Sequence, residues 1–559
     1  MTRKSATIVE IAVLTAIWGA TIAIINPRGD FPLLDDWDFA IATRNFAQSG
    51  HFHFTQFTVV SLRAMVLWGA AWIRLFGDSF NVLRASTLTL SLGAILVVDR
   101  TLARARIARG ARMLASLALL FNPIFLWTSC TYMTDVPYVF ASAVAFYFFF
   151  RGLDEDRVAF IVAGVLSVMV SWFIRQNGLI NILPMMPLAV MKRRRSFVVV
   201  GTCVIALYAL LFVFKRDWLS GAPEMFAVHF HMWGESSFRL PEQVAVFAHY
   251  TVFNAQNSAV FFLPLTLPLL FAWRRLSRRE TIGVALLAAI VFWRVGDLAV
   301  NGYLFPYTTH AMYSDILPGN LVMGGGVGAP MLFDTFNLGY DYPFGIPWSA
   351  RVALTIASAI LAISLLAWLC LRPRPSTEEL PAPEEMLRVL LVRMALALAA
   401  TGTLALFASG YYFDRYSLDS AWSVVLVLPA IVPWSKRGAK IAAIVALASV
   451  AVVSTLAVQE SFIWNRARWQ AWSDLRAHGV AVTQIEGGGD LFGLFELADA
   501  PRAVARSGHP PREFVITFRP LGGYRVMARY PFDSFLGTRH GAIYALRKAG
   551  AVPVSGTSY

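Results

Sequence analysis

The chain has 559 residues, of which 57% are hydrophobic and only 15% are charged. A soluble protein carries about 25% charged and about 45–50% apolar residues, so the composition excludes an ordinary soluble enzyme. The formal net charge of +14 falls in short clusters between apolar segments, which is how membrane topology is encoded and which argues against a nucleic-acid partner.

Apolar segments close to the length of a membrane span recur along the first four fifths of the chain. A helix needs about 20 apolar residues to cross a bilayer, and only helices and closed barrels satisfy the backbone in lipid. The segments are continuous rather than alternating, so we expect an α-helical polytopic membrane protein with about thirteen transmembrane helices. They lie near residues 7–26, 82–99, 113–130, 137–150, 158–174, 179–191, 197–214, 251–273, 281–300, 350–371, 388–409, 419–434 and 439–458.

The charges of the connecting loops predict the orientation. Alternate loops such as 100–112, 274–280 and 435–440 are dense in Arg and Lys, whereas the loop 301–349 contains neither. Because basic loops stay in the cytoplasm, the N-terminus is predicted to be cytoplasmic, with residues 1–26 a retained signal-anchor helix. Thirteen crossings would place the tail on the outer side.

The first outer loop, 27–81, holds the most unusual local feature, Asp35-Asp36-Trp37-Asp38. Three carboxylates in four residues repel one another, so at least one should have a raised pKa and suit general base catalysis. A solvated, helix-capping acidic turn is the alternative. The amphipathic stretch 57–77, which includes Arg63, is predicted to lie in the membrane interface.

Three further charged residues fall at predicted outer helix ends. Asp135 lies in the tight turn Tyr132–Tyr138, where it is either a second site carboxylate or a helix N-cap. Arg175 and Arg415 end or begin spans, and a guanidinium there prefers phosphate or carboxylate partners. Snorkelling toward lipid headgroups is the alternative for both.

The remaining outer loops show no cofactor motif. The glycine run at 319–330 follows no predicted strand and is too irregular for a phosphate loop, so a flexible flap or a connector is expected. His229, His231 and Glu235 match no standard metal spacing. We therefore expect no metal or other cofactor, although a divalent metal stays open.

The tail predicts a small extracytoplasmic α/β domain at 459–559, after a transmembrane domain at 1–458. Residues 464–479 look helical and end at a glycine stop. Short strands are expected at 480–487, 512–520, 523–530 and 541–548.

In their order and side of the membrane, these features resemble the C-class, membrane-embedded glycosyltransferases, in the branch of the protein O-mannosyltransferases and aminoarabinose transferases. The resemblance rests on Asp35-Asp36, on Leu75–Arg84 after the amphipathic stretch, on Met133-Thr-Asp-Val-Pro137 and on Asp414-Arg-Tyr-Ser-Leu418. There are two departures. The family usually has Asp-Glu at the first motif, and its Arg-Tyr pair is often followed quickly by Leu-Pro, where this chain has Ser417-Leu-Asp-Ser.

The resemblance implies an enzyme that takes a sugar from a polyprenyl-phosphate carrier and passes it to a hydroxyl of a lipid, glycan or protein acceptor. It also implies a bacterial inner membrane location with a periplasmic site. Asp35 would be the base with Asp36 as the alternative, and Asp135 would orient the acceptor or the first motif. The arginines that would hold the donor phosphate are Arg175, Arg415 and, as a weaker candidate, Arg63.

Two other classes of function compete with this one. A transporter or flippase of lipid-linked sugars would also have many spans, but it more often shows internal repeats and charge near the membrane midplane. The sequence has no convincing repeat, and its charges gather at outer helix ends. A non-catalytic scaffold would leave the acidic motifs unexplained.

Overall fold

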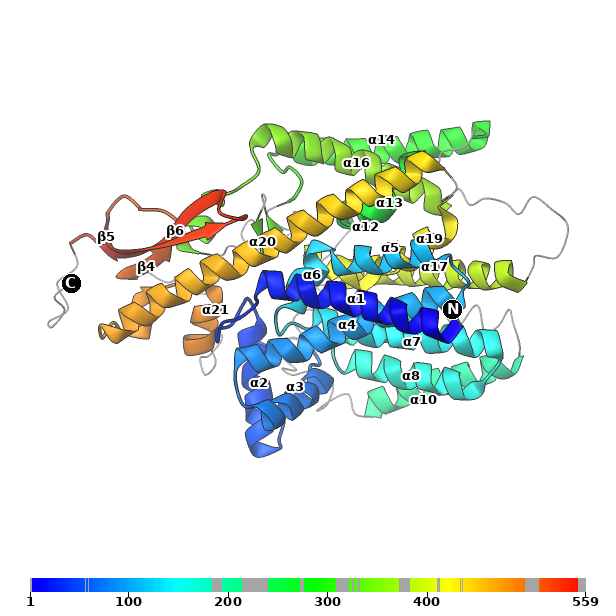
Figure 1. The fold of residues 1–559 in the computed structure, drawn as a ribbon, viewed down its shortest axis with the longest axis horizontal. Coiled ribbons are helices and arrows are strands. Elements are labelled where there is room, and N and C mark those ends of the chain that lie inside the picture. The colour runs from blue at the N-terminus through cyan, green and yellow to red at the C-terminus, as the bar shows by residue number, and fades with distance from the viewer. Residues whose placement is uncertain are drawn as a thin grey trace.

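The fold comes from a computed structural model, drawn in Figure 1. It describes residues 3–55, 57–58, 60–182, 194–213, 240–271, 276–307, 321–323, 326–328, 332–370, 383–409, 413–432, 434, 436–497 and 512–550. Long helices run side by side along one axis of the molecule. The N-terminus lies at one end of this bundle and a small sheet with the C-terminus lies beyond the other end.

The described helices follow the apolar segments of the sequence. In the first half they are α1 (Arg3–Ile25), α2 (Asp36–Ser49), α3 (Arg63–Phe76), α4 (Phe80–Arg104), α5 (Arg109–Leu120), α6 (Pro123–Ser129), α7 (Asp135–Glu155), α8 (Val158–Trp172), α10 (Arg194–Val213), α12 (Leu240–Phe261) and α13 (Leu263–Thr266). In the second half they are α14 (Arg278–Val300), α15 (Phe333–Phe336), α16 (Trp348–Cys370), α17 (Pro383–Ser409), α18 (Leu418–Ala421), α19 (Val424–Ile431), α20 (Arg437–Ala477) and α21 (Gly489–Phe492).

Seven described helices are long and apolar enough to cross a membrane, and an eighth crossing results if one bent pair counts as a single span. The chain is therefore an integral membrane protein of the predicted helical class. The number thirteen stays a prediction, since several segments are short, broken or partly outside the described residues. The long helices are α1, α4, α7, α14, α16, α17 and α20.

A proline explains one of the two breaks within predicted spans. The segment 113–130 is the bent pair α5 and α6, which meet at 62°. Pro123 ends the first helix because it lacks an N–H, and Asn122 caps the second by accepting from Ile124 N and Phe125 N at 3.0 Å. The segment 419–434 is also divided, between α18 and α19, but its Pro429 lies inside α19 and not at the break.

Two helices at the end of the bundle nearer the C-terminal sheet do not follow its axis. Figure 1 shows α2 upright beside α3, below the C-terminal sheet. The amphipathic helix α3 buries Met65 and Val66 and exposes Trp68, Leu75 and Phe76. An exposed apolar face of this kind suits the membrane interface, as predicted for residues 57–77.

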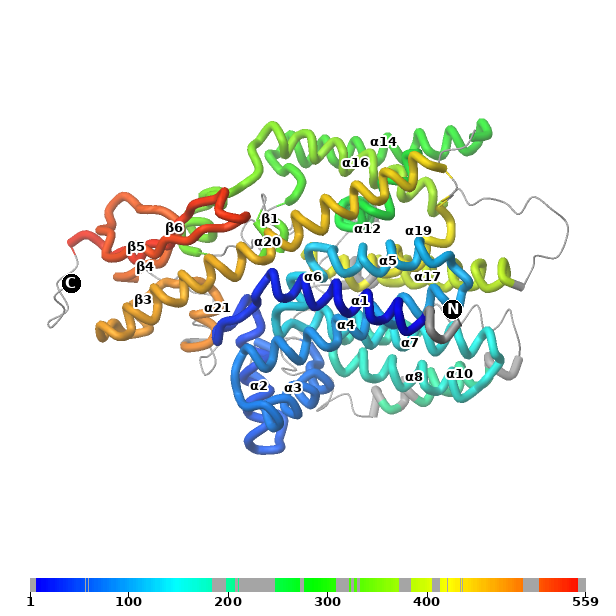
Figure 2. The backbone as a smooth tube through the Cα atoms, in the orientation of Figure 1, coloured from blue at the N-terminus to red at the C-terminus, as the bar shows by residue number. Residues whose placement is uncertain are grey.

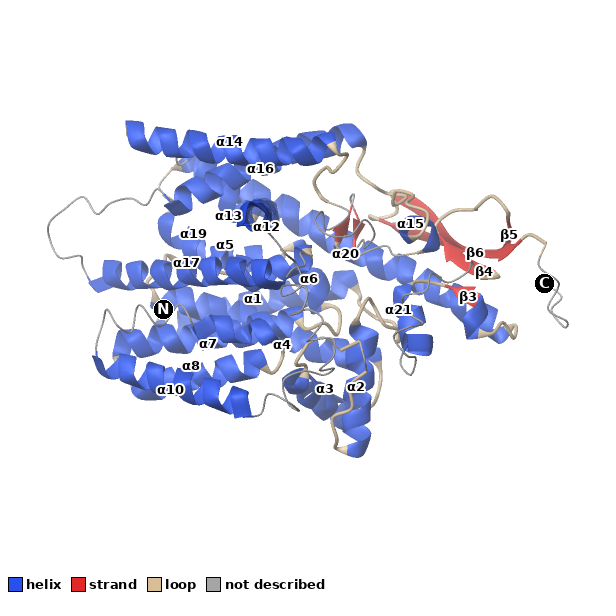
Figure 3. Ribbon diagram, turned by 180° about the vertical axis from the view of Figure 1, so that it is seen from behind, coloured by secondary structure: helices blue, strands red, loops and turns tan. Residues whose placement is uncertain are grey.

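The C-terminal sheet has the strand order β3-β4-β6-β5 and is drawn in red in Figure 3. β3 pairs in parallel with β4, and β6 pairs antiparallel with both β4 and β5. All four predicted strands are confirmed, with β3 shortened to two residues. Their bounds are β3 (Ile485–Glu486), β4 (Phe514–Thr517), β5 (Tyr524–Ser534) and β6 (Arg539–Lys548).

The predicted helix 464–479 is the outer half of α20, which continues without a break from the span before it. The predicted domain junction at 458/459 thus lies inside a 41-residue helix, and Figure 2 shows this helix running from the bundle to the sheet. Its outer half packs against the sheet through Trp464, Ala471 and Leu475.

The glycine run of the loop 301–349 forms a short hairpin, with strands β1 (Val322–Met323) and β2 (Gly326–Val327). Gly328 follows it with φ +94°, and a Cβ there would come within 3.0 Å of Trp127 and Ser461. The glycine is needed both for the backbone and for the close approach to α6 and α20. Around this hairpin the loop is a packed element rather than a plain connector.

Candidate functional site

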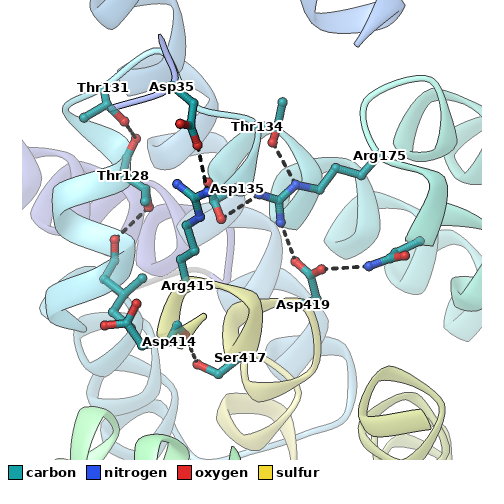
Figure 4. Close-up of polar contacts among 12 residues, drawn as sticks. Asp35, Thr128, Thr131, Thr134, Asp135, Arg175, Asp414, Arg415, Ser417 and Asp419 are labelled. Carbon is teal, nitrogen blue, oxygen red and sulfur yellow. Dashed lines mark hydrogen bonds and ion pairs between the residues drawn. The ribbon is translucent and has the colours of Figure 1, made fainter. Parts of the chain in front are cut away.

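Asp35 and Arg415, which are 380 residues apart in sequence, meet at the start of α2 (Figure 4). Arg415 Nη2 donates to Asp35 Oδ2 at 2.8 Å. The Asp35 side chain is 54% exposed, whereas that of Arg415 is only 10% exposed. The pair therefore offers an accessible carboxylate beside a buried positive charge.

The segment before Asp35 is held by a buried arginine of α4. Arg84 donates to the carbonyl oxygen of Gly29 at 2.5 Å and to that of Phe31. These bonds shape the entry to α2, whose N-cap residue is Asp35. The Asp35 side chain makes no capping hydrogen bond, so the alternative of a simple helix cap does not describe it.

The other two carboxylates of the acidic motif face inward. Asp36 accepts from Leu33 N at 2.6 Å and from Tyr132 N at 3.4 Å, which joins the first acidic motif to the second. Asp38 accepts from Thr55 at 2.5 Å and also from Thr58. Burial raises the pKa of both Asp36 and Asp38 to about 7.

The raised pKa expected for this motif is thus present, but its main cause is burial and not mutual repulsion. Asp36 is fully buried and Asp38 is 3% exposed, so both are placed to hold the loop rather than to meet a substrate. The accessible member of the motif is Asp35.

Asp135 is the first residue of α7, not its N-cap, and its carboxylate faces Arg175. Arg175 donates from Nη2 to Asp135 Oδ1 at 2.8 Å, from Nε to Thr134 at 2.7 Å and from Nη1 to Asp419 at 3.0 Å. Burial alone would lower the pKa of Arg175, but Asp135 and Asp419 raise it above its ordinary value. All three nitrogens of this guanidinium are thus engaged by the protein.

Arg415 differs from Arg175 in having capacity left for a ligand. Its buried Nε has no hydrogen-bond partner among the described residues, and neither has the buried Oδ2 of Asp135. Burial would lower the pKa of Arg415, but Asp35, with a smaller contribution from Asp135, raises it above its usual range. An anion near Arg415 would meet a permanently charged donor.

The residue before Arg415 ties it to the hairpin of the loop 301–349. Asp414 accepts from Leu321 N at 2.8 Å and from Val322 N at 2.7 Å. Burial raises the pKa of Asp414 to about 6. A hollow beside it is lined by Phe253, Asn257, Phe261, Pro306, Tyr307, Val322 and Asp414. The loop thus contacts the site, as expected for a cover.

Arg63 lies against aromatic rings at the start of α3, 5.7 Å from the Phe52 ring centre and 5.2 Å from that of Phe54. Burial lowers the pKa of Arg63 to about 10. Its neighbours Leu62 and Ala64 donate backbone hydrogen bonds to Ile174 and Phe173. The interfacial helix is thereby fixed to the turn that carries Arg175.

The structure therefore brings Asp35, Asp135, Arg175 and Arg415 into one cluster. Sequence reasoning missed Asp419, whose only signal was an acidic residue at the start of an apolar segment. His229, His231 and Glu235 lie outside the described residues. Within the described ranges, no group of three His, Cys, Asp or Glu residues is arranged to hold a metal.

Comparisons with known proteins identify no family. No family model and no curated protein matches the chain. The similar solved structures include ArnT from Cupriavidus metallidurans bound to undecaprenyl phosphate and the same protein in the apo state. The first has a TM-score of 0.40 at 14% identity and covers 99% of this chain and 100% of that one. The second has a TM-score of 0.37 at 13% identity and covers 97% of this chain and 98% of that one. Similarity this weak assigns no function to this chain.

Proposed function

We propose that this chain is a membrane glycosyltransferase that moves a sugar from a polyprenyl-phosphate carrier to a hydroxyl group of an acceptor outside the cytoplasm. The observation that carries the proposal is the contact between Asp35 and Arg415. It joins a potential base to a cation suited to phosphate, beside the interfacial region where a lipid-linked donor must bind.

The reaction needs one proton acceptor and one group that stabilises a leaving phosphate. Asp35 takes the proton from the acceptor hydroxyl as its oxygen bonds to the anomeric carbon of the sugar. The bond from that carbon to the carrier phosphate breaks, and its electron pair leaves with the phosphate. Arg415 stabilises the charge that develops on the phosphate oxygens. No second acid is required, because the phosphate is already a competent leaving group.

The other charged residues have supporting roles in this proposal. Arg175 uses each of its nitrogens on protein partners, so it fixes Asp135 and contributes its charge to phosphate binding from a distance. Asp135 is fully buried and paired with Arg175, so of the two roles considered for it, orienting the first acidic motif fits better than contact with the acceptor. Arg63 lies at the interface as a further contact for the carrier.

The test is sugar transfer by the purified protein with a panel of polyprenyl-phosphate sugars. The matched pair of variants is Asp35→Asn and Asp78→Asn, because Asp78 also pairs with an arginine, Arg44 at 2.8 Å, but on the surface. Acceptor-dependent release of carrier phosphate that is lost only in Asp35→Asn supports the proposal. Movement of the lipid across a reconstituted bilayer without transfer would establish a transporter instead.

A further inference from the structure

Trp37 lies between two acidic residues of α2 and packs against the C-terminal part of the chain. The side chain is only 6% exposed. A Cβ on Gly493 would come closer than 3.0 Å to three atoms of the Trp37 ring. Gly493 has φ −56° and ψ −52°, a helical conformation open to any residue. The glycine is therefore needed for the space beside Trp37, and not for its backbone.

The segment that carries Gly493 is fastened to the outer half of α20. Asp490 of α21 accepts from Arg468 at 2.5 Å, and both side chains are buried. Phe495 stacks on Trp472 with ring centres 5.0 Å apart. An ion pair and an aromatic stack thus fix the residues on either side of Gly493 to one rigid helix.

The same half of α20 also contacts the chain just before Asp35. Trp469 stacks on Phe31 with ring centres 5.8 Å apart. Arg466 donates to the carbonyl oxygen of Asn26 at 3.1 Å. Leu34 has φ +54°, which is unfavourable for a branched side chain and persists only where the surroundings impose it. The segment that presents Asp35 is therefore held by contacts from outside.

A second set of contacts joins α20 and the C-terminal sheet to the loop 301–349. This is the loop whose backbone donates hydrogen bonds to Asp414. Glu460 of α20, which is 1% exposed, accepts from Tyr342 at 2.9 Å and from Ser534 at 2.5 Å. Asp334 accepts from Phe518 N and from Arg519, both at 3.2 Å. The C-terminal part thus fixes the loop 301–349 as well as the acidic segment, and so reaches both members of the Asp35–Arg415 pair.

We propose that the C-terminal unit, residues 459–497 and 512–550, is a positioning element of the transfer site, with Gly493 as the residue that sets Trp37 and through it Asp35. This inference rests on the proposed function, and it gives the tail a role in the reaction. Gly493 touches no reacting atom. It acts by setting the position of the Asp35 carboxylate relative to the Arg415 guanidinium.

The experiment compares Gly493→Ala with Gly522→Ala in the full-length protein. Gly522 belongs to the same unit, and a Cβ there meets nothing within 4 Å. Two readouts are taken: transfer kinetics, and hydrogen–deuterium exchange of the peptide that covers residues 31–45. In Gly493→Ala we expect faster exchange in this peptide and unchanged exchange in α7. We also expect kcat to fall by about tenfold to a hundredfold, with KM for the donor little changed. Gly522→Ala should match the unmodified protein.

A compensating variant separates positioning from general damage. Trp37→Phe removes part of the ring that the new methyl group would meet, so the double variant should regain much of the kcat lost in Gly493→Ala. If Gly493→Ala gives no folded protein, Trp37→Phe alone tests the contact from the other side, with the same expected changes in exchange and kcat.

Unchanged exchange over residues 31–45, or an unchanged kcat, in the folded variant would overturn the inference. If Asp35→Asn abolishes transfer while Gly493→Ala does not, the proposed function stands and the positioning role falls. If Asp35→Asn transfers sugar at the full rate, the proposed function itself is wrong.

Discussion

Two arginine–carboxylate clusters lie at opposite ends of the same helix bundle. They differ in exposure and in how much hydrogen-bonding capacity they have left for a ligand. At the end near the N-terminus, Glu10 of α1 is 3% exposed and accepts from Arg100 at 2.9 Å, Arg112 at 2.8 Å and Arg109 at 3.1 Å. At the end nearer the C-terminal sheet, Asp35 is exposed and pairs with one arginine, whose Nε has no partner among the described residues.

The difference separates a structural cluster from a candidate active site. A buried carboxylate surrounded by three cations has its charge neutralised within the protein, and its role is to join α1, α4 and α5. A carboxylate that is accessible beside an arginine with spare hydrogen-bonding capacity can act on something else. Charge alone does not distinguish the two, because both clusters are rich in arginine.

The largest effect is expected for Asp35→Asn. We expect transfer to fall by about a thousandfold, because the amide cannot accept the acceptor proton. The melting temperature should stay close to that of the unmodified protein, since the side chain is half exposed. Rates and thermal melts of the same preparation check both statements, and a destabilised protein would place Asp35 with the structural residues.

Arg415→Lys is expected to have the next largest effect, a loss of about a hundredfold in kcat. Lysine keeps the charge but loses the planar fork that binds phosphate in a bidentate way. Single-turnover kinetics with a polyprenyl-phosphate sugar measure this loss. An unchanged rate would show that charge near Asp35 is enough, or that the phosphate binds elsewhere.

Glu10→Gln tests the other end of the bundle. Removing this carboxylate leaves Arg112, which is 7% exposed, without its closest ionic partner. We expect the free energy of unfolding to fall by about 3 kcal/mol and kcat of the folded fraction to stay the same. Thermal denaturation followed by the transfer assay measures the two effects, and a specific loss of kcat would contradict the structural role.

A pH titration tests the two buried carboxylates of the acidic motif, Asp36 and Asp38. Burial raises the pKa of Asp36 and Asp38 from 3.8 to about 7, so between these values the folded state binds more protons than the unfolded state. The stability from these groups is fully present below the unfolded pKa and is lost as pH rises through 7, by up to about 1.4 kcal/mol per pH unit for each group. Melting temperatures measured from pH 5 to pH 8 should fall, and Asp36→Asn should reduce the slope. A slope that the variant leaves unchanged would contradict this assignment.

The sequence predicts the helical membrane class, the strands of the tail and the acidic and basic residues of the candidate site. These features are local: an apolar run of span length, an alternating strand or a carboxylate cluster can be recognised from neighbouring residues alone. It did not determine the continuity of α20, because the apolar span and the amphipathic outer half differ in composition although they form one helix.

Which charged residue is exposed and which is buried depends on the tertiary fold. Asp35 and Asp36 are adjacent in sequence, yet one is exposed and the other is fully buried, because the first turn of α2 directs them to different sides. The partners of Asp35 and Trp37 are Arg415 and the segment at Gly493, hundreds of residues away. Such contacts depend on how helices pack against one another, and no local pattern of residues encodes them.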